Sequence, residues 1–178
     1  GCDTFFGVME SPPLPGKRIS ILVNAQTLKP DSATADQKII LPAPTVNPDW
    51  PQAGGYPNHA MHHIKISGKI QEAWSVSIGA GSDNEERLIA QPVVAEGRVY
   101  TMDADSEISA FDAKTGDEIW TTEITPDDED DGHVGGGLAF EDGKLFVTTG
   151  FAEVISLDAK NGKVLWRRKL EAPFRAAP

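Results

Sequence analysis

The sequence has 178 residues, enough for one domain or slightly more, and its apolar content of 39% and charged content of 24% can supply a packed core. The net charge of −11 argues against a surface that binds nucleic acid phosphates. No apolar run approaches the roughly 20 residues that a membrane-spanning helix needs. A globally disordered chain, a nucleic-acid-binding protein and a helical membrane protein are therefore disfavoured.

The chain has one cysteine, Cys2, which cannot form an internal disulfide. Gly1 and Cys2 match the residues around the cleavage site of a bacterial lipoprotein. We predict that Cys2 is the lipidated first residue of the mature protein; the alternative is an ordinary free thiol. Stable anchoring takes more than one acyl chain.

Residues 1–58 differ in composition from the rest, since nine of the thirteen prolines lie there. Proline fixes φ and lacks a backbone donor, so regular elements cannot fill this stretch. The apolar runs at 19–23 and 39–41 fit short edge strands at most. We expect a lipoprotein N-terminus and a mostly extended tether over 1–58, ahead of a separate β-rich region over 59–178.

The β-rich region begins with an expected strand over 64–78 and continues with a sequence repeat. Residues 91–120 align without a gap to residues 137–166, an offset of 46, and seven of the thirty positions are identical. In the first copy, strands are expected over 92–95, 98–102, 107–111 and 117–123 because β-branched and aromatic residues fill these runs between turn signals. The second copy predicts four more.

The last turn of each copy has a specific chemistry. The aspartates Asp112 and Asp158 can accept bonds from backbone N–H groups two residues on, and Gly116 and Gly162 supply a positive φ that closes the turn. Three tryptophans also share the 46-residue phase: Trp74, Trp120 and Trp166.

Four antiparallel strands in a repeat of this length are typical of a β-propeller blade. Residues 64–178 supply a closing strand and about two blades, roughly two and a half repeats, whereas about four to eight blades close a ring. The fold class expected is all-β: a propeller of four-stranded antiparallel blades, present as an incomplete ring. The sequence is therefore expected to be part of a longer chain.

The repeats resemble those of the quinoprotein-like propellers, whose pattern is Ala-x-Asp-x-x-x-Gly-x-x-x-Trp. The first copy fits it fully with Ala110, and the second has Ser156 in place of the alanine. In that family the tryptophan docks against the adjacent blade. The resemblance implies that the blade-docking residues are Trp74, Trp120, Trp166, Asp112, Gly116, Asp158 and Gly162.

Within these propellers the chain is most similar to the BamB lipoproteins of alphaproteobacteria. The likeness rests on Cys2, the proline-rich tether, "DWPQAGGYPNHAMHH" before the first strand, and "AWSVSIGAGSDNEERLIAQPVVAEGRVYTMDAD" opening the first blade. It implies a scaffold without catalytic residues or cofactor, which binds BamA, other assembly-machinery subunits and unfolded outer-membrane proteins. The lipid at Cys2 would hold it on the periplasmic face of the outer membrane.

Two alternatives remain open. A dehydrogenase that depends on pyrroloquinoline quinone (PQQ) would have the same repeat, but no vicinal cysteine pair occurs and no residue matches the catalytic aspartate by motif. The other alternative is a periplasmic binding propeller with a different partner.

Three local clusters were weighed as ligand sites. Residues 127–131 are five consecutive acids, but calcium loops place ligands at alternate positions, so a solvated loop is preferred. A zinc or copper site at His59, His62 and His63 would need a fourth ligand and a defined geometry, so surface and packing roles are preferred. The glycines at 135–137 fit an inner strand where backbones crowd. No metal site is predicted.

Overall fold

The computed structural model describes residues 15–17, 29–66, 68–82, 87–129 and 135–178. Cys2 lies outside the described residues. Contacts divide the chain into two units, Gly1–Ile40 and Leu41–Pro178. The expected change from tether to propeller after residue 58 stays a prediction. In the first unit, the described residues include a turn in which the Asp31 carbonyl accepts a bond of 3.1 Å from the Thr34 N–H.

The second unit contains eight strands in two sheets among its described residues. The first sheet consists of β1 (Val93–Ala95), β2 (Arg98–Met102), β3 (Glu107–Asp112) and β4 (Glu118–Glu123), antiparallel and in that order. These strands match the expected ones to within a residue at each end. Tyr100, Ala110 and Trp120 lie opposite one another across β2, β3 and β4 and form one row on one face.

The second sheet repeats the first. It consists of β5 (Gly136–Glu141), β6 (Lys144–Thr149), β7 (Glu153–Asp158) and β8 (Val164–Lys169), again antiparallel and in chain order. Its equivalent row is Phe146, Ser156 and Trp166. Both sheets have the same register irregularity between their third and fourth strands, at Ala110/Phe111 and Ser156/Leu157. The all-β fold class and the four-stranded antiparallel blades are confirmed.

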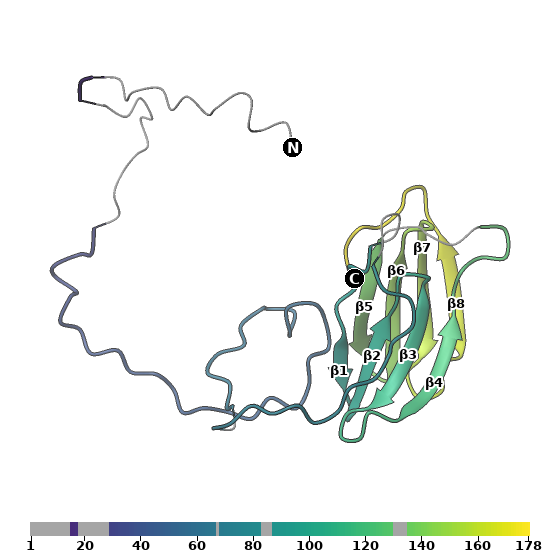
Figure 1. Cartoon of the computed structure of the whole chain (residues 1–178), viewed down its shortest axis with the longest axis horizontal. Coiled ribbons are helices and arrows are strands. Elements are labelled where there is room, and N and C mark those ends of the chain that lie inside the picture. Colours follow the sequence, from purple (N-terminus) through teal and green to yellow (C-terminus); the bar gives the residue numbers. More distant parts are fainter. Residues whose placement is uncertain (1–14, 18–28, 67, 83–86, 130–134) are drawn as a thin grey trace, which may run out of the picture. The chain divides into compact units, whose positions relative to one another are not determined.

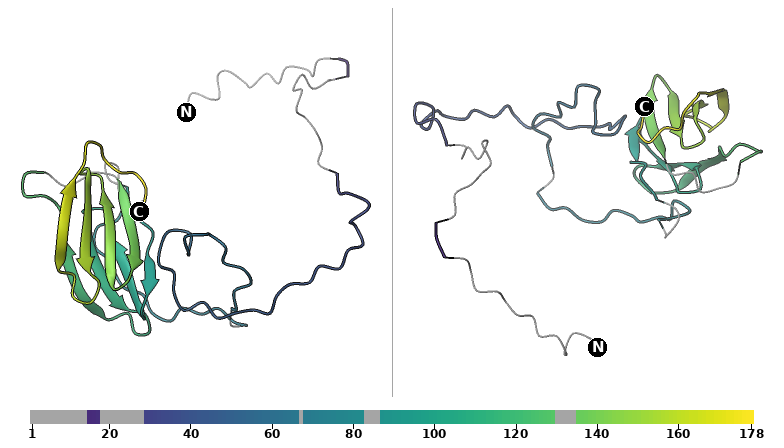
Figure 2. Two further views of the ribbon diagram at one scale, coloured as in Figure 1. Left: turned by 180° about the vertical axis from the view of Figure 1, so that it is seen from behind. Right: turned by 90° about the horizontal axis from the view of Figure 1, so that it is seen from above.

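The hydrophobic core lies between the two sheets, which form separate layers when seen from above (Figure 2). The first sheet contributes Tyr100 and Ile108, and the second contributes Leu145 and Ile155; all four are fully buried. The Tyr100 ring stacks on Phe140 of β5 with a centroid distance of 6.0 Å. Each blade therefore buries one face on the other, as the blades of a propeller do.

The strand expected over 64–78 does not form in the described part of this stretch. Among its described residues, the structure has only an isolated bridge between Ile64 and Thr45, and the rest is irregular. The physical reason is that no neighbouring strand offers this stretch a ladder of backbone hydrogen bonds within the described residues. Over the described part of the chain, the structure also has no helix with the length and apolarity to cross a membrane.

Candidate functional site: the tryptophan seats between repeats

The last turn of the first blade forms a compact seat for a tryptophan. The Asp112 carboxylate accepts bonds from the N–H groups of Lys114, at 2.8 Å, and Thr115, at 3.0 Å. Gly116 closes the turn at a φ of 78°, and its N–H donates to the Asp112 carbonyl at 2.9 Å. The backbone bonds from Lys114 and Thr115 lower the pKa of Asp112, because they stabilise the charged carboxylate.

The second blade builds the same turn. The Asp158 carboxylate accepts a bond of 2.8 Å from the Lys160 N–H, and Gly162 donates to the Asp158 carbonyl at 2.9 Å. Gly162 has a φ of 73°. Aspartate and glycine thus occupy equivalent places in both copies, where sequence analysis expected them to shape the turn.

Trp74 occupies the seat of the first blade. Its indole N–H donates to the carbonyl oxygen of Ala113 at 3.2 Å. A Cβ on Gly116 would lie 2.8 Å from the indole ring, so only glycine leaves room for the ring at this distance. Trp74 reaches this seat although it lies in an irregular segment, outside any strand.

Trp120 occupies the seat of the second blade with the same geometry. Its indole N–H donates to the carbonyl oxygen of Ala159 at 3.1 Å, and a Cβ on Gly162 would lie 2.5 Å from the ring. The side chain is 9% exposed. Thr122 of the same strand donates to the Gly162 carbonyl at 2.9 Å. One seat is therefore filled from the preceding segment and the next from the preceding blade.

Trp166 has the same phase but a different environment. It is 45% exposed, and no described residue accepts a bond from its indole N–H. Its ring packs on Phe146 at a centroid distance of 6.3 Å, as Trp120 packs on Tyr100 at 6.0 Å. The outer face of the second blade thus presents the aromatic pair that the first blade buries.

Sequence analysis missed the acceptor in the seat. The Ala159 carbonyl receives the Trp120 N–H, the Arg98 guanidinium at 2.8 Å and the Tyr100 hydroxyl at 3.3 Å. Burial raises the pKa of Tyr100, and the neighbouring Arg98 opposes this shift. The sequence contained one relevant signal, because the alanine after the aspartate is identical in both copies (Ala113 and Ala159). The alignment does not reveal that the backbone carbonyl of this alanine is the acceptor.

Of the acidic run at 127–131, the structure describes only residues 127–129. Asp130 and Asp131 lie outside the described residues, and Glu129 forms an ion pair of 3.5 Å with Lys169. His63 Nδ1 lies 2.8 Å from the Pro42 carbonyl. Among the residues with a described position, no three His, Cys, Asp or Glu side chains gather around a common point.

The glycine run at 135–137 leads into β5, the first strand of the second sheet, so it lies at the beginning of a strand as expected. β5 starts with Gly136, at a φ of 91°. A Cβ there would strike the carbonyl of Thr148 on β6, so the backbones crowd as expected. No phosphate or metal role is needed to explain these residues.

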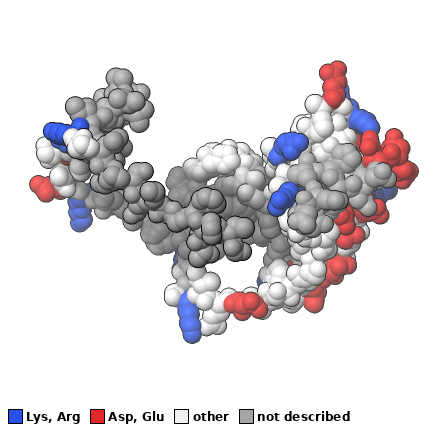
Figure 3. All heavy atoms as spheres, turned by 45° about the horizontal axis from the view of Figure 1, so that its top comes forward, with Lys and Arg blue, Asp and Glu red and all other residues white. Residues whose placement is uncertain are grey.

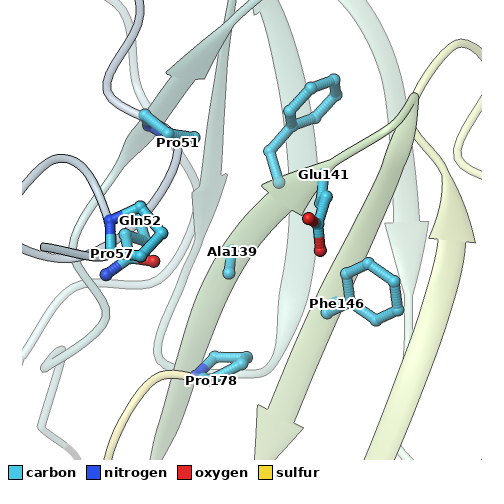
Figure 4. A pocket seen from close by; sticks show the side chains of 8 residues that line it. Pro51, Gln52, Pro57, Ala139, Glu141, Phe146 and Pro178 are labelled. Atoms are coloured by element: carbon cyan, nitrogen blue, oxygen red, sulfur yellow. The ribbon is translucent and has the colours of Figure 1, made fainter.

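A cavity of about 470 Å³ lies beside the outer face of the second blade. Pro51, Gln52 and Pro57 line one side, and Ala139 and Phe146 line the other (Figure 4). Glu141 is the one charged residue in its lining. Acidic side chains are frequent on the visible face of the blades, with basic ones among them (Figure 3).

Two stacked four-stranded blades joined by repeated tryptophan seats define the class of protein: a PQQ-like repeat β-propeller, here in part. A quinohemoprotein alcohol dehydrogenase from Comamonas testosteroni is similar in structure, with a TM-score of 0.55 and 27% sequence identity. The match covers 68% of this chain and 19% of the dehydrogenase.

The chain belongs to the family described as outer membrane protein assembly factor BamB, whose sequence model matches residues 67–129 and 104–178. The BamB of Burkholderia pseudomallei (strain K96243) is 34% identical over 58 residues, which are 33% of this chain and 14% of that protein. BamB from Moraxella catarrhalis matches with a TM-score of 0.40 and 14% identity, over 50% of this chain and 27% of that one. The chain thus spans well under two thirds of these relatives.

Proposed function

We propose that this chain is part of a scaffold lipoprotein of the β-barrel assembly machinery, without catalytic activity of its own. It binds BamA and other subunits and assists the insertion of outer-membrane β-barrel proteins. Membership of the BamB family carries the proposal. The seats support it further, because they are built from backbone carbonyls, glycines and indole rings, which suit the stacking of blades into a rigid surface.

The proposed location is the periplasmic face of the outer membrane, with a lipid on Cys2 as the anchor. The full-length precursor, expressed in a Gram-negative host, should give a mature chain that starts at Cys2 and has the added mass of acyl groups. Cys2→Ser should move the protein from the membrane fraction to the periplasm. An unmodified Cys2 thiol in intact-mass spectrometry of the membrane fraction would rule out the anchor.

The proposed partner is tested by co-purification. Affinity-tagged full-length protein, cross-linked in cells and solubilised in mild detergent, should recover BamA. A tagged unrelated outer-membrane lipoprotein at the same expression level is the matched control. If BamA is recovered equally with both baits, or with neither, the scaffold proposal fails.

A second candidate function is a dehydrogenase that depends on PQQ. The similarity to a quinohemoprotein alcohol dehydrogenase at 27% identity favours it. The two candidates separate in one assay: PQQ and Ca²⁺ are added to the full-length protein, followed by an alcohol and an electron-accepting dye. A new absorbance band with alcohol-dependent dye reduction would establish the enzyme; the scaffold proposal expects neither.

A further inference from the structure

Residues 49–55, here called the strap, cross the inner edges of both blades. The backbone N–H of Trp50 donates to the Val94 carbonyl at 2.6 Å, and the Val94 N–H returns a bond of 2.9 Å to the Trp50 carbonyl. The Asp49 carboxylate accepts a bond of 3.1 Å from the Glu96 N–H at the end of β1. The strap therefore pairs with β1 as a very short additional strand.

The same strap then pairs with the second blade. The Phe140 N–H of β5 donates to the Pro51 carbonyl at 2.7 Å, and Gln52 forms an antiparallel bridge with Ala139. A tight turn follows, in which Gln52 and Gly55 exchange backbone bonds of 3.2 and 2.9 Å. The strap thus occupies part of the free edge of β5, the first strand of its sheet (Figure 1).

The strap forms few backbone contacts with β5. It engages only Ala139 and Phe140, although β5 is six residues long. Residues 49–53 are half-buried, and the cavity of about 470 Å³ lies between the strap and the outer face of the second blade. Isolated bridges over a hollow contribute much less than a continuous ladder over a packed core.

The surroundings of the strap define the chemistry of a partner. The large cavity is lined by Pro51 and Gln52 of the strap itself and, on the side that stays when the strap leaves, by the apolar Phe146 and Pro178. An adjoining cavity of about 290 Å³ is lined by Asp49 of the strap and, on the blades, by the acidic Glu96 and Glu141 beside the apolar Ala95 and Phe140. A segment that replaced the strap would place apolar side chains in the first cavity and a lysine or arginine beside the carboxylates of the second.

We propose that the strap is a self-inhibitory strand that covers the free edge of β5, and that an extended apolar segment with a flanking basic residue displaces it. The inference rests on the proposed function, since unfolded outer-membrane β-strands are such segments. The partner gains backbone bonds along β5 by strand addition. Only molecules whose strap has left β5 can bind the segment. The apparent affinity is therefore the intrinsic affinity multiplied by the fraction of open molecules.

The test locks the strap with a disulfide. Gln52→Cys and Ala139→Cys are introduced together into the full-length protein that also has Cys2→Ser. Facing residues of an antiparallel pair lie about 4.5–5.5 Å apart between their Cα atoms, within the range of a disulfide. The probe is a fluorescent ten-residue peptide of alternating valine and threonine with one tryptophan and two terminal lysines, measured by anisotropy.

The reduced double-cysteine protein should bind the peptide, and the oxidised protein should bind it at least about tenfold more weakly, as expected when the open fraction falls tenfold. Asp49→Ala, which removes the carboxylate that accepts the Glu96 N–H and so loosens the strap, should strengthen binding, provided that its circular dichroism matches the parent. Equal affinity of the reduced and oxidised forms would overturn the proposal. Equal affinity for a peptide with glutamates in place of the lysines would overturn the assigned charge preference.

The failure of this inference is distinguishable from the failure of the proposed function. BamA co-purification, measured on the same oxidised and reduced protein, should not depend on the lock. If the peptide affinity depends on the disulfide but BamA is not recovered, the strap proposal holds and the scaffold proposal fails. If BamA is recovered but the peptide affinity does not depend on the disulfide, the scaffold proposal holds and the strap proposal fails.

Discussion

At the scale of single residues, the seats depend on an indole ring that enters a space only glycine leaves open. Trp120 is almost fully buried against Gly162 and uses its N–H on the Ala159 carbonyl. Trp166, of the same type and phase, is 45% exposed. The chain therefore contains both the buried residue and its own control.

Trp120→Ala should lower the free energy of unfolding of this chain by roughly 3 kcal/mol or more, because it removes a large buried ring and leaves a cavity. Trp166→Ala should cost on the order of 1 kcal/mol or less, since nearly half of that side chain is already exposed. Urea unfolding followed by circular dichroism gives both values, at protein concentrations where light scattering shows no association. Equal losses for the two variants would contradict the seat as a stabilising contact.

Gly162→Ala separates crowding from backbone strain. Gly162 and Gly97 have almost the same φ, 73° and 72°, but a Cβ on Gly162 would strike Trp120 while a Cβ on Gly97 would meet nothing within 4 Å. Gly97→Ala should cost about 1 kcal/mol from the left-handed backbone alone. Gly162→Ala should cost roughly 1–3 kcal/mol more because the ring must move. Similar melting temperatures would show that the ring is not seated against Gly162.

At the scale of elements, the Asp-to-Gly turns are stabilised by a carboxylate that bonds to backbone N–H groups. The bonds from Lys114 and Thr115 lower the folded-state pKa of Asp112 below its ordinary value of 3.8. A lowered folded pKa means that the contribution of Asp112 is present above the unfolded pKa and is lost as the pH falls through the folded pKa. The turn should therefore weaken as the pH falls below about 3.8, the ordinary pKa of the group.

Nuclear magnetic resonance titration of the Asp112 carboxyl carbon should give a pKa below 3.8. The matched variant is Asp112→Asn, which keeps the shape but has no titrating group. Its unfolding free energy should change less with pH below about pH 4 than that of the parent, because the acid-sensitive group is gone. A carboxyl that titrates at or above its ordinary value would show that the backbone bonds do not form in solution.

The strand expected over 64–78 illustrates a limit at the same scale. Its alternating apolar residues satisfy the local requirement for a strand, but a strand also needs a neighbour for its backbone groups. Among the described residues of this segment, only Ile64 has a bridge, to Thr45. The side chain of Trp74 instead contacts the first blade, where its indole N–H donates to the Ala113 carbonyl.

At the scale of the whole molecule, the two blades present an unequal pair of surfaces. The inner faces bury a shared core, whereas β8 exposes Leu165 at 46% and Trp166 at 45%, next to Phe146. Exposed apolar strands at the edge of a sheet favour association with other chains. The 178-residue chain is therefore a candidate for self-association.

Light scattering should show that the 178-residue chain associates at micromolar concentration and that the full-length protein is a monomer. Leu165→Lys together with Trp166→Lys should reduce association of the 178-residue chain, because both side chains become charged on the exposed strand. Ile39→Lys with Ile40→Lys, also on exposed apolar residues but far from the sheets in the sequence, is the control. A monomeric parent chain with a cooperative melt would contradict this prediction.

The two blades could be predicted from the amino-acid sequence. The 46-residue offset, the alternation in each strand and the Asp-to-Gly turns all depend on windows of a few residues, so the eight strands and the turn residues could be placed without a structure. Which groups from distant segments meet could be seen only in the folded chain. Trp74 and Trp120 are seated, the Ala159 carbonyl accepts from three donors, and the strap pairs with β1 and β5. The physical reason is that every residue has the same backbone carbonyl and N–H groups. The residue types therefore do not indicate which carbonyl or which strand edge a distant segment will contact.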